Sequence, residues 1–165
     1  MLAAVGVGAG ALVAGVAYRV GPRVYNARKL ARLQGRRVYD ETVDGRARVV
    51  EALARASAEQ KRALVVLGGN WCQWCLALDE LLASDAEIAR LLATRFVLLK
   101  LDGDVAEALD IEWGRPTKLG VPVLVFLNSD GGVAHIQETV SLERFGGRIL
   151  LHDRDRVLTV LRAWA

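Results

Sequence analysis

The feature that most constrains this chain is a pair of cysteines, Cys72 and Cys75, which are the only two that it contains. They lie where an aliphatic run, residues 63–67, ends at two glycines and a helical pattern, residues 76–83, begins. Two thiols three positions apart at a strand-to-helix junction can close into a disulfide. The first thiol would lie at the start of the helix, where unpaired backbone N–H groups stabilise a thiolate. This arrangement predicts thiol–disulfide exchange.

Length and composition allow one folded domain with an additional segment. The chain has 165 residues, of which 53% are hydrophobic and 25% are charged, so a packed core is expected and bulk disorder is not. Two cysteines cannot build a disulfide scaffold, and two ligands alone cannot complete a structural zinc site. The two cysteines are therefore expected to have a reactive role and not a structural one.

The first 20 residues predict a membrane anchor. Residues 2–17 carry no charged or polar side chain, and their number is near the lower limit of about 17–25 residues for crossing a bilayer. Tyr18 and Arg19 follow as interfacial residues would. A cleaved signal peptide is an alternative, although the usual basic start is missing. Residues 6–11 loosely imitate a dinucleotide-binding loop, but no strand precedes them.

Residues 21–43 predict a basic juxtamembrane linker. Seven basic residues and no acidic residue lie between Arg19 and Arg37, a pattern typical of contact with anionic lipid head groups. No set of aromatic residues beyond Tyr25 is interleaved with them, which argues against a nucleic-acid partner. By the positive-inside rule, this segment places the domain that follows on the cytoplasmic side.

Residues 44–165 are expected to form an α/β domain. The apolar pattern predicts helices over residues 44–61 and 76–83, a helix capped at Ser84, a short helix ending at Leu109, a final helix capped at Asp153, and strands over residues 63–67, 96–101, 123–127 and 133–138. The first two strands would form a parallel pair joined by a right-handed crossover, and the last two an antiparallel hairpin. The sequence thus predicts a mixed central sheet with helices on both faces, preceded by an N-terminal apolar helix.

This order of elements resembles the thioredoxin superfamily over residues 62–164. The resemblance rests on Trp71-Cys72-x-x-Cys75 after a strand and on Gly120-Val121-Pro122 before one. The motif Asn-Trp-Cys-x-x-Cys after a glycine is similar to that of thioredoxin-like domains in bacterial envelope proteins. The resemblance implies a thioredoxin-like three-layer α/β/α fold for residues 44–165.

The resemblance also implies roles for individual residues. Cys72 aligns with the attacking cysteine and Cys75 with the resolving cysteine, while Pro122 aligns with a cis-proline that lies against them and helps to seat an extended substrate. Lys100 aligns with a lysine near the active site. Val66 stands where thioredoxin has a buried aspartate, so the acid that helps to deprotonate the resolving thiol is missing or is supplied by another residue.

Aromatic residues flank the cysteines. Trp71 and Trp74 would cover the thiols or offer a surface to a peptide, although Trp71 could equally pack under the loop. Together with Val121 and Pro122, we expect them to bind substrate. Neither histidine neighbours a cysteine in the sequence, so a Cys–His nucleophile pair is not expected.

The combined prediction is a membrane-tethered thiol–disulfide oxidoreductase that acts on protein thiols and disulfides through a redox-active disulfide, Cys72–Cys75. No bound cofactor and no metal are expected, and another thiol protein would supply or accept electrons. One alternative is a module that binds extended peptides at Pro122 without turnover. Another is a protein that clamps a soft ion such as Cu(I) between the two cysteines. The resemblance favours the periplasmic or extracytoplasmic side of a membrane, and we expect that side, although the basic flank favours the cytoplasmic side.

Overall fold

The computed structural model describes residues 31–144 and 152–165. Within these residues one sheet is formed by four strands: β1 (Arg62–Gly68), β2 (Phe96–Asp102), β3 (Val123–Leu127) and β4 (Val133–Glu138). The strand order is β2-β1-β3-β4, with β1 parallel to β2 and antiparallel to β3, and with β4 antiparallel to β3. The predicted mixed sheet, built from a parallel pair and a hairpin, is confirmed.

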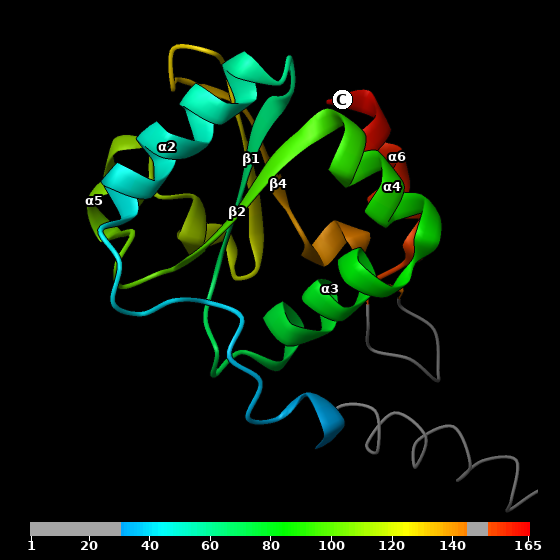
Figure 1. Ribbon diagram of the computed structural model, residues 1–165. Helices are drawn as coiled ribbons and strands as arrows, with labels where there is room; N and C mark the ends of the chain where they lie inside the picture. The colour runs from blue at the N-terminus through cyan, green and yellow to red at the C-terminus, as the bar shows by residue number, and fades with distance from the viewer. Residues whose placement is uncertain (1–30, 145–151) are drawn as a thin grey trace, which may run out of the picture.

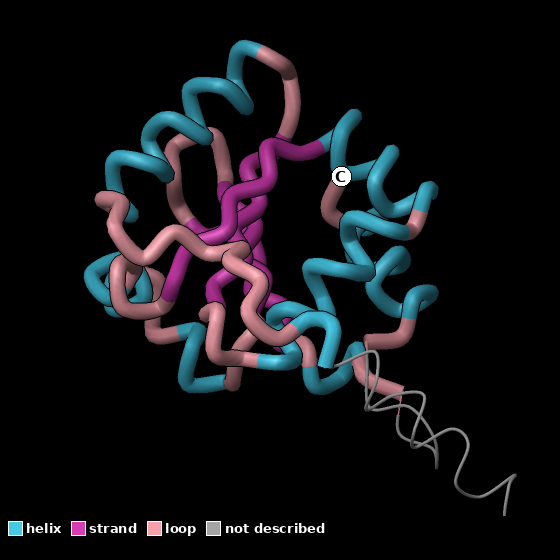
Figure 2. Tube along the Cα trace, turned by 60° about the horizontal axis from the view of Figure 1, so that its bottom comes forward, coloured by secondary structure: helices cyan, strands magenta, loops and turns pink. Residues whose placement is uncertain are grey.

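Helices cover both faces of this sheet. They are α2 (Gly45–Ala58), α3 (Gln73–Ser84), α4 (Ala86–Arg95), α5 (Glu107–Glu112) and α6 (Arg154–Ala163), with short 3₁₀ helices η1 (Pro116–Leu119) and η2 (Val140–Leu142). Figure 1 shows α2 and α5 on one side of the strands and α3, α4 and α6 on the other. The same separation is visible when the molecule is turned (Figure 2). The expected three-layer α/β/α arrangement is therefore present.

Aspartates begin three of the helices. Asp44 and Asp153 accept backbone N–H groups at the starts of α2 and α6, and Asp153 takes the capping role that the sequence predicts. At α4 the cap is Asp85, whose carboxylate accepts the N–H groups of the second and third helical residues. The expectation of Ser84 as this cap is wrong, because Ser84 is still the last residue of α3 and only one residue separates the two helices.

The central strand β1 is buried on both faces, and this burial positions the cysteine loop. Its side chains alternate, so that Val65 and Leu67 pack with α2 while Leu64 and Val66 pack with α3, α4 and α6. Because β1 ends between two helical layers, the loop that follows it emerges at one end of the sheet. Cys72 and Cys75 lie in that loop and in the first turn of α3.

Part of the segment expected to be a linker packs against the domain. Leu33 is buried against α3, Tyr39 is buried beside the two cysteines, and Asp40 makes a parallel bridge with Leu101 of β2. In Figure 1 this segment passes the start of α3 before it reaches α2. The domain therefore begins before residue 44. The high basic charge of the segment hides the few apolar side chains that anchor it.

The membrane anchor expected at residues 1–20 lies outside the described residues, as does the apolar N-terminal helix of the predicted fold. The first part of the basic segment, residues 21–30, lies outside them as well. In residues 31–144 and 152–165, no helix combines the length and the apolar character that crossing a membrane requires.

Candidate active site

Cys72 is the residue that begins α3. It is the N-cap of this helix, and its Sγ accepts a hydrogen bond from the backbone N–H of Cys75, with 3.2 Å between sulfur and nitrogen. The partial positive charge of unpaired N–H groups at a helix start stabilises a thiolate there. The predicted placement of the first thiol at a strand-to-helix junction is confirmed.

Both thiols are free, and they differ in burial. Cys75 is fully buried, with 0% of its surface exposed, whereas Cys72 retains 6%. Only a small part of Cys72 is therefore open to a substrate. This order follows from the fold, because Cys75 lies in the first turn of a helix that packs on the sheet.

The electrostatics of the pair shift the pKa values of the two thiols in opposite directions. A hydrogen bond from Cys75 is the main cause that lowers the pKa of Cys72 to about 7 from its ordinary value of 9.0. Burial opposes this effect, and the backbone N–H groups of Cys75 and Trp74 reinforce it. The same hydrogen bond, together with burial and the negative charge on Cys72, raises the pKa of Cys75 above its usual range. When the reduced pair loses one proton, the negative charge therefore resides on Cys72 and Cys75 remains a thiol.

We expect the alkylation rate of Cys72 by iodoacetamide to rise with pH around a midpoint near 7, because only the thiolate reacts. In Cys75→Ala the main stabilising hydrogen bond is lost, and the midpoint should move up by about one to two pH units. Mass spectrometry of the labelled protein at a series of pH values measures both curves. A wild-type midpoint at the ordinary value of 9.0 would contradict the hydrogen-bonded pair.

The loop before β3 forms the opposite side of the site. The Val121–Pro122 peptide bond is cis, and the sulfur of Cys72 lies 3.6 Å from the carbonyl oxygen of Val121, to which it donates a hydrogen bond only when it is protonated. The hydroxyl of Thr139 donates to the carbonyl oxygen of Pro122 at 2.6 Å. The structure thus brings residues distant in sequence, Val121 and Pro122, next to Cys72.

The two tryptophans of the motif occupy different environments. Trp71 is 76% exposed and its ring folds back over Gly69, so it does not pack under the loop. Trp74 is half-buried and meets the ring of His152 edge-on, with 6.1 Å between ring centroids. Burial lowers the pKa of His152 to about 4, which keeps its ring neutral near pH 7. The sequence gives no sign that His152 lies so close, because it follows the motif by a long stretch of chain.

A buried carboxylate lies behind the cysteines. Asp79, 5% exposed, is one helical turn after Cys75 on α3 and forms ion pairs with Lys100 and with Arg36, the latter at 2.8 Å. Lys100, which the resemblance places near the active site, is therefore a partner of Asp79. Val66, at the position of the missing aspartate, is buried against the same helical layer. Sequence reasoning missed Asp79, for which the four-residue spacing from Cys75 was the available signal.

Asn70 anchors the N-terminal segment beside the site. Its side-chain oxygen accepts the N–H groups of Val38 and Tyr39 at 2.8 and 3.0 Å. Its side-chain nitrogen donates to the carbonyl oxygen of Tyr39 and to the carboxylate of Glu41, both at 2.8 Å. These contacts hold Tyr39 in one cluster with Cys72 and Cys75. Nothing in the sequence pattern pointed to Tyr39.

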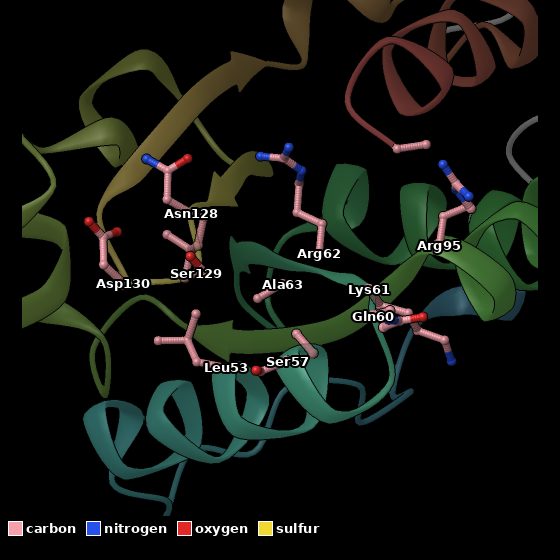
Figure 3. Close-up of a pocket in the computed structure, with 13 residues that line it drawn as sticks. Leu53, Ser57, Gln60, Lys61, Arg62, Ala63, Arg95, Asn128, Ser129 and Asp130 are labelled. Carbon is pink, nitrogen blue, oxygen red and sulfur yellow. The ribbon is translucent and has the colours of Figure 1, made fainter.

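The molecule also has a pocket far from the cysteines. A cavity of about 540 Å³ lies at the end of the sheet where β1 begins, and Arg62, Arg95 and Asp130 are among its lining residues (Figure 3). Neither cysteine lines it. The cysteines follow the opposite end of β1, so this cavity is separate from the candidate active site.

Comparisons with known proteins agree with this geometry. No curated protein matches the chain. It is similar to the solved structure of a disulphide isomerase from Xylella fastidiosa Temecula1, with 34% identity over 63% of this chain and 81% of that chain, and a TM-score of 0.58. It is also similar to a thioredoxin from Thermus thermophilus, with 28% identity over 69% and 81% and a TM-score of 0.51.

Two further comparisons bear on the fold and the family. A DsbH oxidoreductase has the same fold at 17% identity, over 70% of this chain and 80% of that chain, with a TM-score of 0.50. A family model described as thioredoxin-like matches residues 46–129, which are just over half of the chain and include both cysteines and Pro122. The chain therefore belongs to the thioredoxin-like family.

Proposed function

We propose that this protein is a thiol–disulfide oxidoreductase that exchanges disulfides with protein substrates through Cys72 and Cys75. The observation that carries the proposal is the asymmetric pair at the start of α3, in which the Cys72 sulfur caps the helix and accepts the backbone N–H of Cys75, while Cys75 itself is fully buried. The similarity to a disulphide isomerase and to a thioredoxin supports it. Such a pair can accept or deliver two electrons without a bound cofactor.

In the reducing direction, the thiolate of Cys72 attacks one sulfur of a substrate disulfide. A bond forms between Cys72 and that sulfur, the substrate S–S bond breaks, and the other substrate sulfur leaves as a thiolate and takes up a proton. Cys75 then loses its proton and attacks Sγ of Cys72, which releases the second substrate thiol. The substrate has gained two electrons, and the protein now holds the Cys72–Cys75 disulfide. Another dithiol protein must reduce this disulfide to complete the cycle.

The substrate would lie across Trp71, Trp74, Val121 and Pro122. Trp71 offers a large exposed aromatic surface immediately before the attacking thiol. The half-buried Val121 and the Pro122 loop flank the same sulfur. An extended polypeptide lying along this loop would bring its disulfide to Cys72.

Insulin reduction tests the proposal. With dithiothreitol as the electron donor, the full chain should accelerate precipitation of the insulin B chain above the rate with dithiothreitol alone. Equilibration of Cys72 and Cys75 with glutathione buffers gives the reduction potential in the same protein. A potential near about −270 mV would indicate a reductase and one near about −120 mV an oxidant. No acceleration of insulin reduction, despite a reversible disulfide, would refute turnover on protein substrates.

The two alternative functions give different results in these measurements. A peptide-binding module would bind unfolded peptides and leave insulin intact. A protein that handles soft metal would take up Cu(I) in proportion to reduced cysteine pairs, which titration with a colorimetric Cu(I) chelator measures. For an oxidoreductase, we expect alkylation of Cys72 to abolish insulin reduction, and we expect the protein to fold without any metal.

For the N-terminal part we propose a membrane anchor at residues 1–20, with the domain on the periplasmic or extracytoplasmic side. The support is the uncharged composition of residues 2–17 and the family resemblance. Reporter fusions after residue 43 test the side of the membrane on which the domain lies. Activity of an exported reporter supports the extracytoplasmic side, and activity of a cytoplasmic reporter contradicts it.

A further inference from the structure

Tyr39 reaches the resolving cysteine from a segment outside the strand–loop–helix motif. Its side chain is 3% exposed and lies in one buried cluster with Cys72 and Cys75. Its hydroxyl and the sulfur of Cys75 converge on Gly68, where an added Cβ would lie 2.6 Å from the hydroxyl oxygen and 2.8 Å from the sulfur. The phenol therefore lies beside the Cys75 thiol, close enough for the two side chains to interact. Glycine at this position makes room for the contact.

The phenol is suited to donate, not to accept, a proton. Burial is the main cause that raises the pKa of Tyr39 above its usual range, and the negative charges of the cysteines and Asp79 add to it. The hydroxyl therefore keeps its proton throughout the physiological range. Asp79 itself is held by Lys100 and Arg36.

In the resolving step, a hydrogen-bond donor beside Cys75 would stabilise the thiolate that must form there. In the mixed disulfide Cys72 no longer carries a negative charge, so its contribution to raising the pKa of Cys75 disappears and burial remains. Two neighbours then act to lower the pKa of Cys75: the backbone of Gly69 and the hydroxyl of Tyr39. The position on β1 where thioredoxin has a buried aspartate is Val66, so no carboxylate is present there.

We infer that the hydroxyl of Tyr39 donates to the Cys75 sulfur and stabilises it as a thiolate when it attacks the mixed disulfide. The inference rests on the proposed function, because it assigns a role within that exchange. The Cys75 proton passes to water, a bond forms between the sulfurs of Cys75 and Cys72, and the bond from Cys72 to the substrate sulfur breaks. The departing thiolate takes up a proton, and Tyr39 is unchanged.

Ellman's reagent separates the two steps in the full chain without a protein substrate. In stopped flow, the first aromatic thiolate is released when Cys72 attacks the reagent, and the second when Cys75 closes the disulfide. In Tyr39→Phe, which keeps the ring, the second phase should slow by about tenfold or more, the effect of one lost hydrogen bond to a charged group. The first phase should stay within twofold of wild type. The pH midpoint of the second phase should rise by about one unit.

Two further variants keep the test decisive. Gly68→Ala would place a methyl group 2.6 Å from the phenol oxygen and 2.8 Å from the Cys75 sulfur, so the two must move apart, and both the rate and the pH midpoint of the second phase should change. Thr42→Val removes an exposed hydroxyl of the same segment, which donates only to the nearby Asp40, and it should match wild type in both phases. Circular dichroism checks that each variant is folded.

Each result decides the inference. A second phase in folded Tyr39→Phe equal to wild type overturns it, and so does equal slowing of both phases, which indicates a purely structural role. If Tyr39→Phe does not fold, a higher pH midpoint of the second phase in Gly68→Ala supports the inference, and an unchanged midpoint there overturns it. A wild-type protein that closes its disulfide but does not reduce insulin would refute the proposed function and leave this role of Tyr39 standing.

Discussion

Cys72→Ser should reduce insulin no faster than dithiothreitol alone, whereas Cys75→Ser should attack the substrate and remain attached to it. A serine hydroxyl does not ionise near neutral pH, so the variant at Cys72 lacks the nucleophile that starts the exchange. In Cys75→Ser the thiolate of Cys72 still forms the first bond, but the sulfur that would break it is absent. A mixed disulfide with the substrate should therefore accumulate.

Non-reducing electrophoresis of each variant, incubated with an unfolded disulfide-bonded protein, measures this difference. We expect an adduct with Cys75→Ser that disappears after dithiothreitol, and none with Cys72→Ser. The chain has only these two cysteines, so any adduct identifies the attacking sulfur directly. Adducts formed by Cys72→Ser but not by Cys75→Ser would reverse the assigned roles. The experiment is needed because the exposed fractions of the two cysteines, 6% and 0%, differ only slightly.

The sequence predicted most of the fold because its strongest signals are local. The run from residue 63 to residue 67 is apolar and bounded by charge and glycine, which indicates a strand buried on both faces, and β1 is such a strand. The two neighbouring strand segments at residues 123–127 and 133–138 predicted the hairpin that β3 and β4 form. Asp153 predicted the start of α6. Each of these signals depends on neighbours within a few positions.

The parts of the site that were missed depend on contacts between distant segments. Tyr39 and Arg36 lie in a stretch whose net charge dominated its interpretation, and only tertiary contacts with Asn70 and Asp79 place them at the cysteines. His152 reaches Trp74 in the same way. A one-dimensional pattern records which side chains can be buried, but not which distant side chains meet.

Asp79→Ala should lower the free energy of unfolding of the reduced protein by about 2–3 kcal/mol. Removing one member of a buried ion pair leaves its partner uncompensated, which typically costs about 3–5 kcal/mol. Here the cost is smaller because the side chains of Lys100 and Arg36 remain 27% and 35% exposed, so water screens them in part. Urea unfolding measures the change.

The chain offers a matched control for this prediction, because the same arginine binds two carboxylates. Arg36 pairs with Glu80 at 2.6 Å, and the side chain of Glu80 is 37% exposed, so Glu80→Ala should cost about 0–1 kcal/mol. Asp79→Ala combined with Lys100→Met should recover part of the loss, since the unpaired ammonium is then removed as well. If Asp79→Ala and Glu80→Ala lower the free energy of unfolding equally, the burial of Asp79 does not strengthen its ion pairs. Because Arg36 also leads into the segment that carries Tyr39, Asp79→Ala should in addition slow the second phase with Ellman's reagent more than Glu80→Ala does.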